Sequence, residues 1–332
     1  MFQVTQMLPL PTLLLSPSSS QFPIHPSPPT KLEPLSIPSK QPKPPPSPPD
    51  EIPASKLLAL ACEDLTTWTA GPYAILLQLA SPGIARGSCA HSRFTSDPIS
   101  RFLRTAVFIL AVTHGTPRQL TAICDVITEQ HSHVHGKGYD ARDVELQKWT
   151  AATLFVGTRK GRMVFGEGEK AVGMRNRKEM EGLCRESGRF ASVLDMPEGM
   201  WPGGLDEFEE YWEGEMERIE REGVDGVSRE MGRVLLFGLG LPWWLGWVVV
   251  VVRVVVARWL PDGLRRAYGL GDPMGWGMWV AYAVTVWVVW GVNWAMPKSL
   301  KRVVNRGMVG YMASAAGGHR EDWRVDDMMR LG

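Results

Sequence analysis

The stretch from residue 97 to residue 136 most constrains the fold, because it predicts two consecutive helices separated by a short break. Asp97 is a suitable N-cap, and Pro98 suits the first turn of a helix. Gly115 interrupts the helical pattern, and Thr116-Pro117 begins it again in the same way. The apolar face of the first helix is formed by Phe102, Ala106, Ile109 and Leu110. This pattern predicts a mainly helical protein.

One stripe of the second helix ends in an imidazole. The stripe consists of Leu120, Cys124, Ile127 and His131. His131 has two interpretations, a core histidine bonded to a backbone carbonyl or an axial ligand to haem iron. On the preceding helix, Arg101, Arg104 and Thr105 share one face. Guanidinium groups pair with carboxylates such as haem propionates, and a hydroxyl can donate to bound oxygen. The residues alone leave both interpretations open.

Short segments from about residue 65 to the C-terminus carry a family resemblance. They include GPYAILLQLA at 71–80, PGIA at 82–85, HSRF at 91–94, RFLRT at 101–105, HSHVHG at 131–136 and LQKWTAATL at 146–154. In order and spacing, this set resembles the catalytic domain of the MpaB-type and rubber (latex-clearing) oxygenase family.

The resemblance implies an all-α, globin-like, multi-helix haem-binding bundle. It also implies haem b iron as cofactor and dioxygen as co-substrate, used to cleave a carbon–carbon double bond in an isoprenoid or other apolar substrate. By position, His131 matches the haem-ligand histidine of the family. Arg101, Arg104 and Thr105 match the catalytic motif R-x-x-(R/K)-T over the haem. The two arginines are expected to anchor propionates, and we expect His91 to line the pocket.

Two positions depart from the family pattern. Many members have histidine where this chain has Ser81, and many have histidine where this chain has Ala151. These departures motivate an alternative hypothesis, in which the chain is a catalytically inactive, membrane-associated helical protein of the same fold.

Composition separates a tail from a single large domain. Residues 1–52 are rich in proline and serine, which predicts a disordered N-terminal tail. Residues 53–332 are assigned to the catalytic domain, in which 140–155 predict a helix and the glycines between 157 and 173 predict an irregular segment. The formal net charge is +1, which gives no reason to expect a nucleic-acid partner. The four cysteines are widely spaced and match no zinc pattern.

Two C-terminal segments, about 234–260 and 276–296, are very apolar. Each is long enough to cross a bilayer, which requires roughly 20 apolar residues. Nine of the 14 tryptophans lie between Trp243 and Trp294, where they suit membrane interfaces. We therefore expect a membrane-associated protein with a two-helix hairpin. The endoplasmic reticulum is one compartment consistent with this expectation. The alternative is a pair of buried helices that cover the haem and admit an apolar substrate.

Two further metal hypotheses are weaker. His131, His133 and His135 alternate, which suits a chelating strand or loop, but no carboxylate or cysteine lies at a helpful spacing. The acidic segment 206–222 offers many carboxylates but no Glu-x-x-His, which a di-iron bundle requires. Its simplest interpretation is a solvated helix whose inward residues are Phe208, Trp212, Met216 and Ile219.

Overall fold

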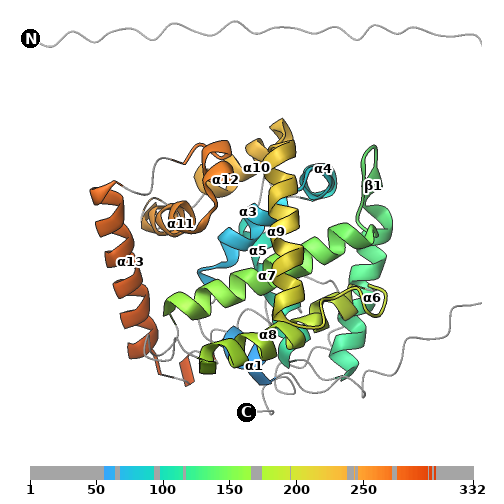
Figure 1. Ribbon diagram of the computed structural model, residues 1–332, viewed down its shortest axis with the longest axis horizontal. Coiled ribbons are helices and arrows are strands. Elements are labelled where there is room, and N and C mark those ends of the chain that lie inside the picture. Colours follow the sequence, from blue (N-terminus) through green and yellow to red (C-terminus); the bar gives the residue numbers. More distant parts are fainter. Residues whose placement is uncertain are drawn as a thin grey trace, which may run out of the picture. The chain divides into compact units, whose positions relative to one another are not determined.

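Helix α3, Gly71–Leu79, lies at the centre of the computed structural model (Figure 1). Every residue from Tyr73 to Leu79 is buried. A helix that is apolar around its whole circumference cannot face water on any side, so its neighbours must enclose it. Helices α4, α7, α10 and α11 provide that enclosure.

The structure describes residues 56–63, 68–92, 98–114, 117–165, 174–194, 196–237, 243, 246–270, 275–297, 299–300 and 303. They all belong to one compact unit, Ser47–Gly332. The predicted disordered tail, 1–52, lies outside the described residues.

The described residues form helices almost throughout. Around α3 these are α1 (Lys56–Glu63), α4 (Pro82–His91), α5 (Pro98–His114), α6 (Pro117–His133), α7 (Val144–Phe165), α8 (Met174–Val193), α9 (Leu205–Glu222), α10 (Gly226–Phe237), α11 (Gly246–Trp259), α12 (Asp262–Ala267) and α13 (Trp276–Ala295). A short antiparallel hairpin joins β1 (His135–Gly136) to β2 (Tyr139–Asp140). The predicted all-α class is confirmed, and both helices of the 97–136 stretch begin at their prolines. The globin-like, haem-binding part stays a prediction.

Helix α7 is longer than the sequence predicted. It begins at Val144 and continues through Gly157 and Gly161 to Phe165, so the irregular segment predicted from residue 157 is wrong as far as Phe165. Residues 166–173 lie outside the described part of the chain. A Cβ at Gly157 would lie 3.1 Å from the Cβ of Ala74 on α3. This glycine therefore serves the close approach of two helices and does not break one.

The acidic helix α9 behaves as expected. Phe208 and Ile219 are buried, and Trp212 stacks on Trp149 of α7 with ring centroids 5.0 Å apart. Phe208 also meets Phe155 edge-on, at 4.6 Å. The carboxylates of α9 occupy the opposite, solvated face, which confirms the amphipathic interpretation.

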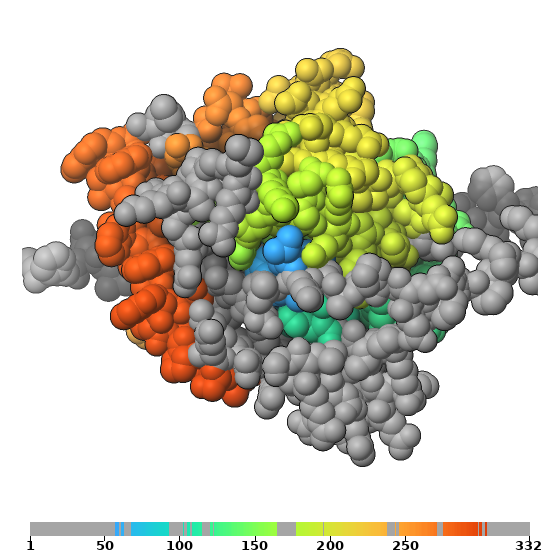
Figure 2. Space-filling view, turned by 60° about the horizontal axis from the view of Figure 1, so that its bottom comes forward, coloured from blue at the N-terminus to red at the C-terminus, as the bar shows by residue number. Residues whose placement is uncertain are grey.

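The described C-terminal residues do not form the predicted transmembrane hairpin. Helix α11 has 14 residues, and its second half, Val254–Ala257 and Trp259, is buried in the core against α3. Of the described helices, α13 alone is long and apolar enough to cross a membrane. In Figure 2 the residues of α13, drawn in orange-red, lie at the surface. The segment about 234–260 was mispredicted because a buried core helix is as apolar as a lipid-facing one.

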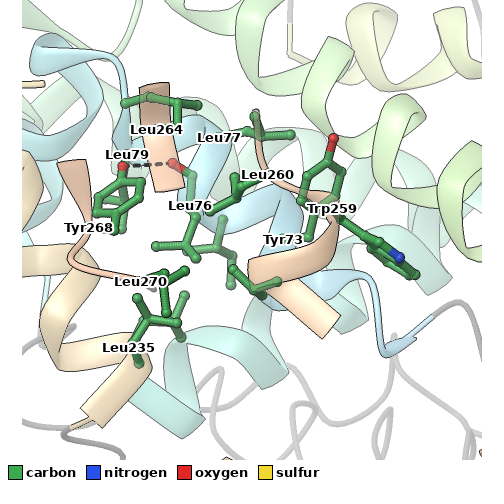
Figure 3. Close-up of a cluster of buried hydrophobic side chains, with 14 of the residues drawn as sticks. Tyr73, Leu76, Leu77, Leu79, Leu235, Trp259, Leu260, Leu264, Tyr268 and Leu270 are labelled. Atoms are coloured by element: carbon green, nitrogen blue, oxygen red, sulfur yellow. Dashed lines mark hydrogen bonds between the residues drawn. The ribbon is translucent and has the colours of Figure 1, made fainter. Parts of the chain in front are cut away.

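Side-chain hydrogen bonds fix the central helix among its neighbours (Figure 3). The Tyr268 hydroxyl donates to the Leu76 carbonyl over 2.8 Å, and the Trp149 indole N–H donates to the Leu77 carbonyl over 3.1 Å. The ring of Tyr73 meets Trp259 of α11 edge-on, with centroids 5.7 Å apart. Buried polar atoms are thus paired at the same places where the apolar packing is densest.

Candidate functional site

Thr105 of α5 lies beside a small hollow between α1, α3, α5 and α7. The hollow provides about 40 Å³ for water-sized molecules. Its walls are mainly apolar, with side chains that include Cys62, Ile75, Phe102, Ala106, Ile109 and Leu154. The α5 face that was predicted to be catalytic therefore reaches an apolar interior space through Thr105.

Three hydrogen-bonding groups reach this hollow. They are the hydroxyls of Thr105 and Thr158 and the indole of Trp68. The Trp68 N–H is buried and has no hydrogen-bond partner among the described residues. An unpaired buried donor is costly, and it marks a place where the N–H could donate to an oxygen of a ligand. Neither Trp68 nor Thr158 was predicted to be a site residue.

Arg101 and Arg104 lie on α5, as predicted. Their side chains lie outside the described residues, so the structure tests neither the propionate contacts nor the contact with oxygen. Their roles stay predictions.

His131 lies in the last turn of α6 and is half-buried. Its backbone carbonyl accepts the N–H of Val134 over 3.1 Å, at the point where the chain turns into the β1–β2 hairpin. Upstream on the same stripe, Cys124 and Ile127 pack against the core cluster that contains Phe190 of α8. His131 does not line the hollow beside Thr105. The structure therefore does not bring His131 and Thr105 together around one cavity.

His91 ends α4 and is exposed. Its Nε2 lies 3.0 Å from the hydroxyl of Tyr139, and the two rings meet edge-on with centroids 5.8 Å apart. This contact attaches α4 to the hairpin at the surface. The predicted pocket role of His91 has no support from its position.

The described side chains do not fit a haem as they stand. A hollow with about 40 Å³ for water-sized molecules holds at most a few waters, whereas a porphyrin is many times larger. Among the described residues, no group of three histidine, cysteine or acidic side chains is placed to hold a metal ion. A single axial imidazole needs no such group. Haem could enter only if the helices around the hollow moved apart.

Burial also decides the state of the one thiol that faces the hollow. It raises the pKa of Cys62 from 9.0 to about 12, because the thiolate would lose its hydration. Cys62 is therefore a neutral thiol near pH 7 and not a thiolate ligand.

The two departures from the family pattern are buried. Ala151 of α7 is fully buried in the core cluster with Phe155, and Ser81 is buried at the N-cap of α4. Neither residue lines the hollow. A histidine at position 151 would need space that the packed core does not offer.

A second hollow, of about 410 Å³, lies between α10 and α12 and is more polar. Its walls include Arg229, Arg233 and Arg266 together with Glu230. Among the described side chains, none of the predicted site residues lines it.

Comparison with known proteins decides the family. Residues 62–290 match the domain described as "ER-bound oxygenase mpaB/B'/Rubber oxygenase, catalytic domain". The chain belongs to this family. The match covers α3 to α12, most of α13 and the end of α1, so the oxygenase-family domain accounts for nearly the whole helical unit.

Two curated mycobacterial proteins are similar to this chain. The Uncharacterized protein Mb2261 of Mycobacterium bovis and the Uncharacterized protein Rv2237 of Mycobacterium tuberculosis are each 26% identical over 178 residues. The alignment covers 51% of this chain and 66% of each relative, slightly less than two thirds of their length. No solved structure matches the chain.

Proposed function

We propose that the chain is a haem b-dependent oxygenase that uses dioxygen to cleave a carbon–carbon double bond in an isoprenoid or other apolar substrate. The observation that carries the proposal is the match of residues 62–290 to an oxygenase catalytic domain. An apolar hollow with few hydrogen-bonding groups at the Thr105 face of α5 supports it, since such a lining suits an apolar substrate.

In this proposal His131 would hold the haem iron, and haem would supply the redox chemistry when bound. Arg101 and Arg104 would pair with the propionates, and Thr105 would donate a hydrogen bond to an oxygen of the ligand. The apolar walls of the hollow, including Phe102 and Ile109, would exclude water and contact an apolar substrate once the surrounding helices move apart. The Trp68 N–H would offer a second donor, to which no described residue of the chain is hydrogen-bonded.

An inactive helical protein of the same fold is the second candidate. It is favoured by Ser81 and Ala151, which replace histidines of many family members, and by the small size of the hollow. The two candidates differ in one observable, because an inactive relative that has lost haem has no Soret band.

Visible spectroscopy of the full chain in detergent, supplied with haem, tests the proposal. We expect a Soret band in the wild type, its loss in His131→Ala and its retention in His133→Ala. His133 is the matched control because it is exposed and lies two residues further along the same helix. A wild type that stays colourless sinks the haem proposal and favours the inactive alternative.

Trp68→Phe tests the polar group of the hollow. Removing the unpaired N–H relieves a desolvation penalty of about 1–3 kcal/mol, and the smaller phenyl ring leaves a cavity with the opposite effect, so the net change in the free energy of unfolding should be small. The oxygen-dependent turnover of polyprenyl alkenes should fall, since a donor to the ligand is lost. Unchanged turnover would remove Trp68 from the site.

We also propose that the protein associates with a membrane, and that the endoplasmic reticulum is a compartment that suits it. The surface position of the apolar helix α13 supports membrane association. A prenylated substrate partitions into lipid, so a membrane location agrees with the proposed chemistry.

A further inference from the structure

The outer face of α13 carries an exposed row of tryptophans that no described element covers. Its members are Trp276, Trp279, Trp287, Trp290 and Trp294, here called the tryptophan stripe. At 100° per residue they fall within about 80° of the helix circumference. Exposure is 81% at Trp276, 72% at Trp287 and 75% at Trp294, so the stripe is open at both ends and in the middle.

The stripe is too large to be ordinary apolar surface. At about 250 Å² for a whole tryptophan, the exposed fractions total roughly 800 Å². The largest apolar patch of a typical soluble monomer is about 300–600 Å². None of the five indole N–H groups has a hydrogen-bond partner within the described structure. Such a surface requires a partner that accepts both an apolar ring and its N–H.

The inner face of α13 excludes a helix enclosed by lipid. Tyr282, Val286 and Val289 pack on the central core, and the Trp259 N–H of α11 donates to the Tyr282 hydroxyl over 2.9 Å. Helix α7, against which α13 also packs, carries the ion pair Arg159–Glu209 and a half-buried Lys160. Charged side chains at the centre of a bilayer cost at least about 2.5–3.5 kcal/mol each. The core behind α13 therefore cannot accompany it into the hydrocarbon.

The positions of the tryptophans agree with this argument. In a spanning helix, tryptophan concentrates at the two ends, where headgroups begin. Here Trp287 is the twelfth residue of a 20-residue helix, close to the depth that would be mid-bilayer. A helix in the plane of the interface places every member of such a row at the headgroup level.

Charge argues for lipid over a second copy of the chain. Neither α11 nor α13 contains an acidic residue, whereas Arg253 and Arg258 of α11 are exposed. The Arg253 guanidinium covers the half-exposed ring of Phe237, 4.5 Å from its centroid. A symmetric dimer through α11 and α13 would find no acidic residue on either helix to pair with these arginines. Anionic headgroups would complement them.

We propose that α13 is an interfacial docking helix, which lies in the plane of an anionic membrane surface with its tryptophan stripe in the headgroup layer and its inner face on the protein core. This inference rests on the proposed membrane association and is independent of haem. In this proposal the protein is attached to one leaflet of the membrane, whereas the sequence predicted a hairpin that spans both.

Vesicle co-sedimentation of the full chain tests the occupant. The probes are vesicles of phosphatidylcholine alone and vesicles in which about one lipid in five is phosphatidylserine. We expect tighter binding to the anionic vesicles, and a loss of at least tenfold in partitioning for the double variant Trp287→Ser, Trp290→Ser. Met163→Ser, an exposed apolar residue of α7, is the control and should bind as the wild type does. Equal binding of the double variant overturns the proposal.

Labelling from outside the vesicle tests the orientation. Gly275→Cys and Met296→Cys, each in a Cys89→Ser background that removes the exposed native thiol, place a reporter at either end of α13. An impermeant maleimide should label both ends of vesicle-bound protein equally. Protection of one end alone would show a spanning helix and overturn the interfacial geometry.

Light scattering tests whether a second copy of the chain, and not lipid, covers the tryptophan stripe. A wild type that is dimeric without lipid and does not bind vesicles, with a monomeric double variant, would assign the stripe to a second copy and overturn the proposal. A protein that shows the His131-dependent Soret band but does not bind vesicles would overturn this inference alone. Vesicle binding without a Soret band would leave it intact and sink the haem proposal.

Discussion

Helices α3 and α13 are both almost entirely apolar, yet one is enclosed by protein and the other has an open outer face. Seven of the nine residues of α3 are buried, and all of them are Tyr, Ala, Ile or Leu except Gln78, which donates a hydrogen bond to Thr153. In α13 only Thr285 is buried, and tryptophans form its exposed row. Apolarity therefore does not decide the environment of a helix in this protein. The kind of apolar residue does, because aliphatic side chains interdigitate in a core whereas tryptophan combines a large ring with an N–H that seeks an interface.

The largest expected effect is the loss of stability when a buried side chain of the central helix α3 is truncated. Leu76→Ala removes a side chain that is 0% exposed and should lower the free energy of unfolding by about 2–5 kcal/mol, since a cavity remains. Trp287→Ala, a larger truncation on α13, should change it by less than about 0.5 kcal/mol. Urea unfolding without lipid measures both values. Similar losses at the two positions would mean that α13 is covered in solution.

The next effect concerns the space beside α3. A Cβ at Gly232 of α10 would overlap the ring of Tyr268 and touch Leu76, so Gly232→Ala should cost about 1–3 kcal/mol. Gly214→Ala is the matched control, because Gly214 lies within α9 with open space around it. That change should stabilise the protein by about 0.5–1 kcal/mol. Thermal unfolding measures both variants. If their melting temperatures shifted in the same direction, the close contact of Gly232 with Tyr268 would be contradicted.

A smaller effect isolates one hydrogen bond of the central helix. Tyr268→Phe keeps the ring but removes the donor to the Leu76 carbonyl, which leaves a buried acceptor without this partner. We expect a loss of about 1–2 kcal/mol in the free energy of unfolding. Tyr282→Phe, which removes the acceptor of the Trp259 N–H between α11 and α13, should cost less because that bond is only partly buried. The reverse order would make α13 the more firmly held helix.

The last test is the loss of folding stability at alkaline pH. Burial raises the pKa of the Cys62 thiol from 9.0 to about 12 and that of Tyr73 from 10.0 to about 12. The folded state thus keeps protons that the unfolded state releases, so stability is fully present below pH 9 and is lost as the pH rises toward 12. Urea midpoints between pH 8 and 11 should fall less steeply in Cys62→Ala than in the wild type. Parallel slopes would contradict a buried Cys62.

The sequence was sufficient where a local signal and the tertiary packing agree. Pro98 and Pro117 begin their helices as predicted, and the inward positions of Phe208, Trp212 and Ile219 follow from helical spacing alone. The signal failed where one composition serves two purposes. Gly157 suggested a break but permits a close helix contact, and the valine-rich segment 248–256 suggested a membrane span but its end is core.

The candidate site was predictable only in part. The spacing of RFLRT and the family resemblance selected α5, and Thr105 does face an interior hollow. The other walls come from α1, α3 and α7, which are distant in sequence, so no local pattern identifies Trp68 or Thr158 as their polar members. His131 was selected by an apolar stripe that continues upstream as Cys124 and Ile127, and this packing alone accounts for the stripe.

The hydrogen bond from Trp259 to Tyr282 has a mechanical consequence. Trp259 holds α13 through its N–H, while its ring rests against Tyr73, the residue that precedes Ala74 and Ile75 in the wall of the hollow. The outermost helix and the innermost one are thus connected by two side chains. A sideways pull on α13, such as lateral pressure in a lipid layer, reaches the wall of the hollow through this short linkage and need not pass through the rest of the bundle.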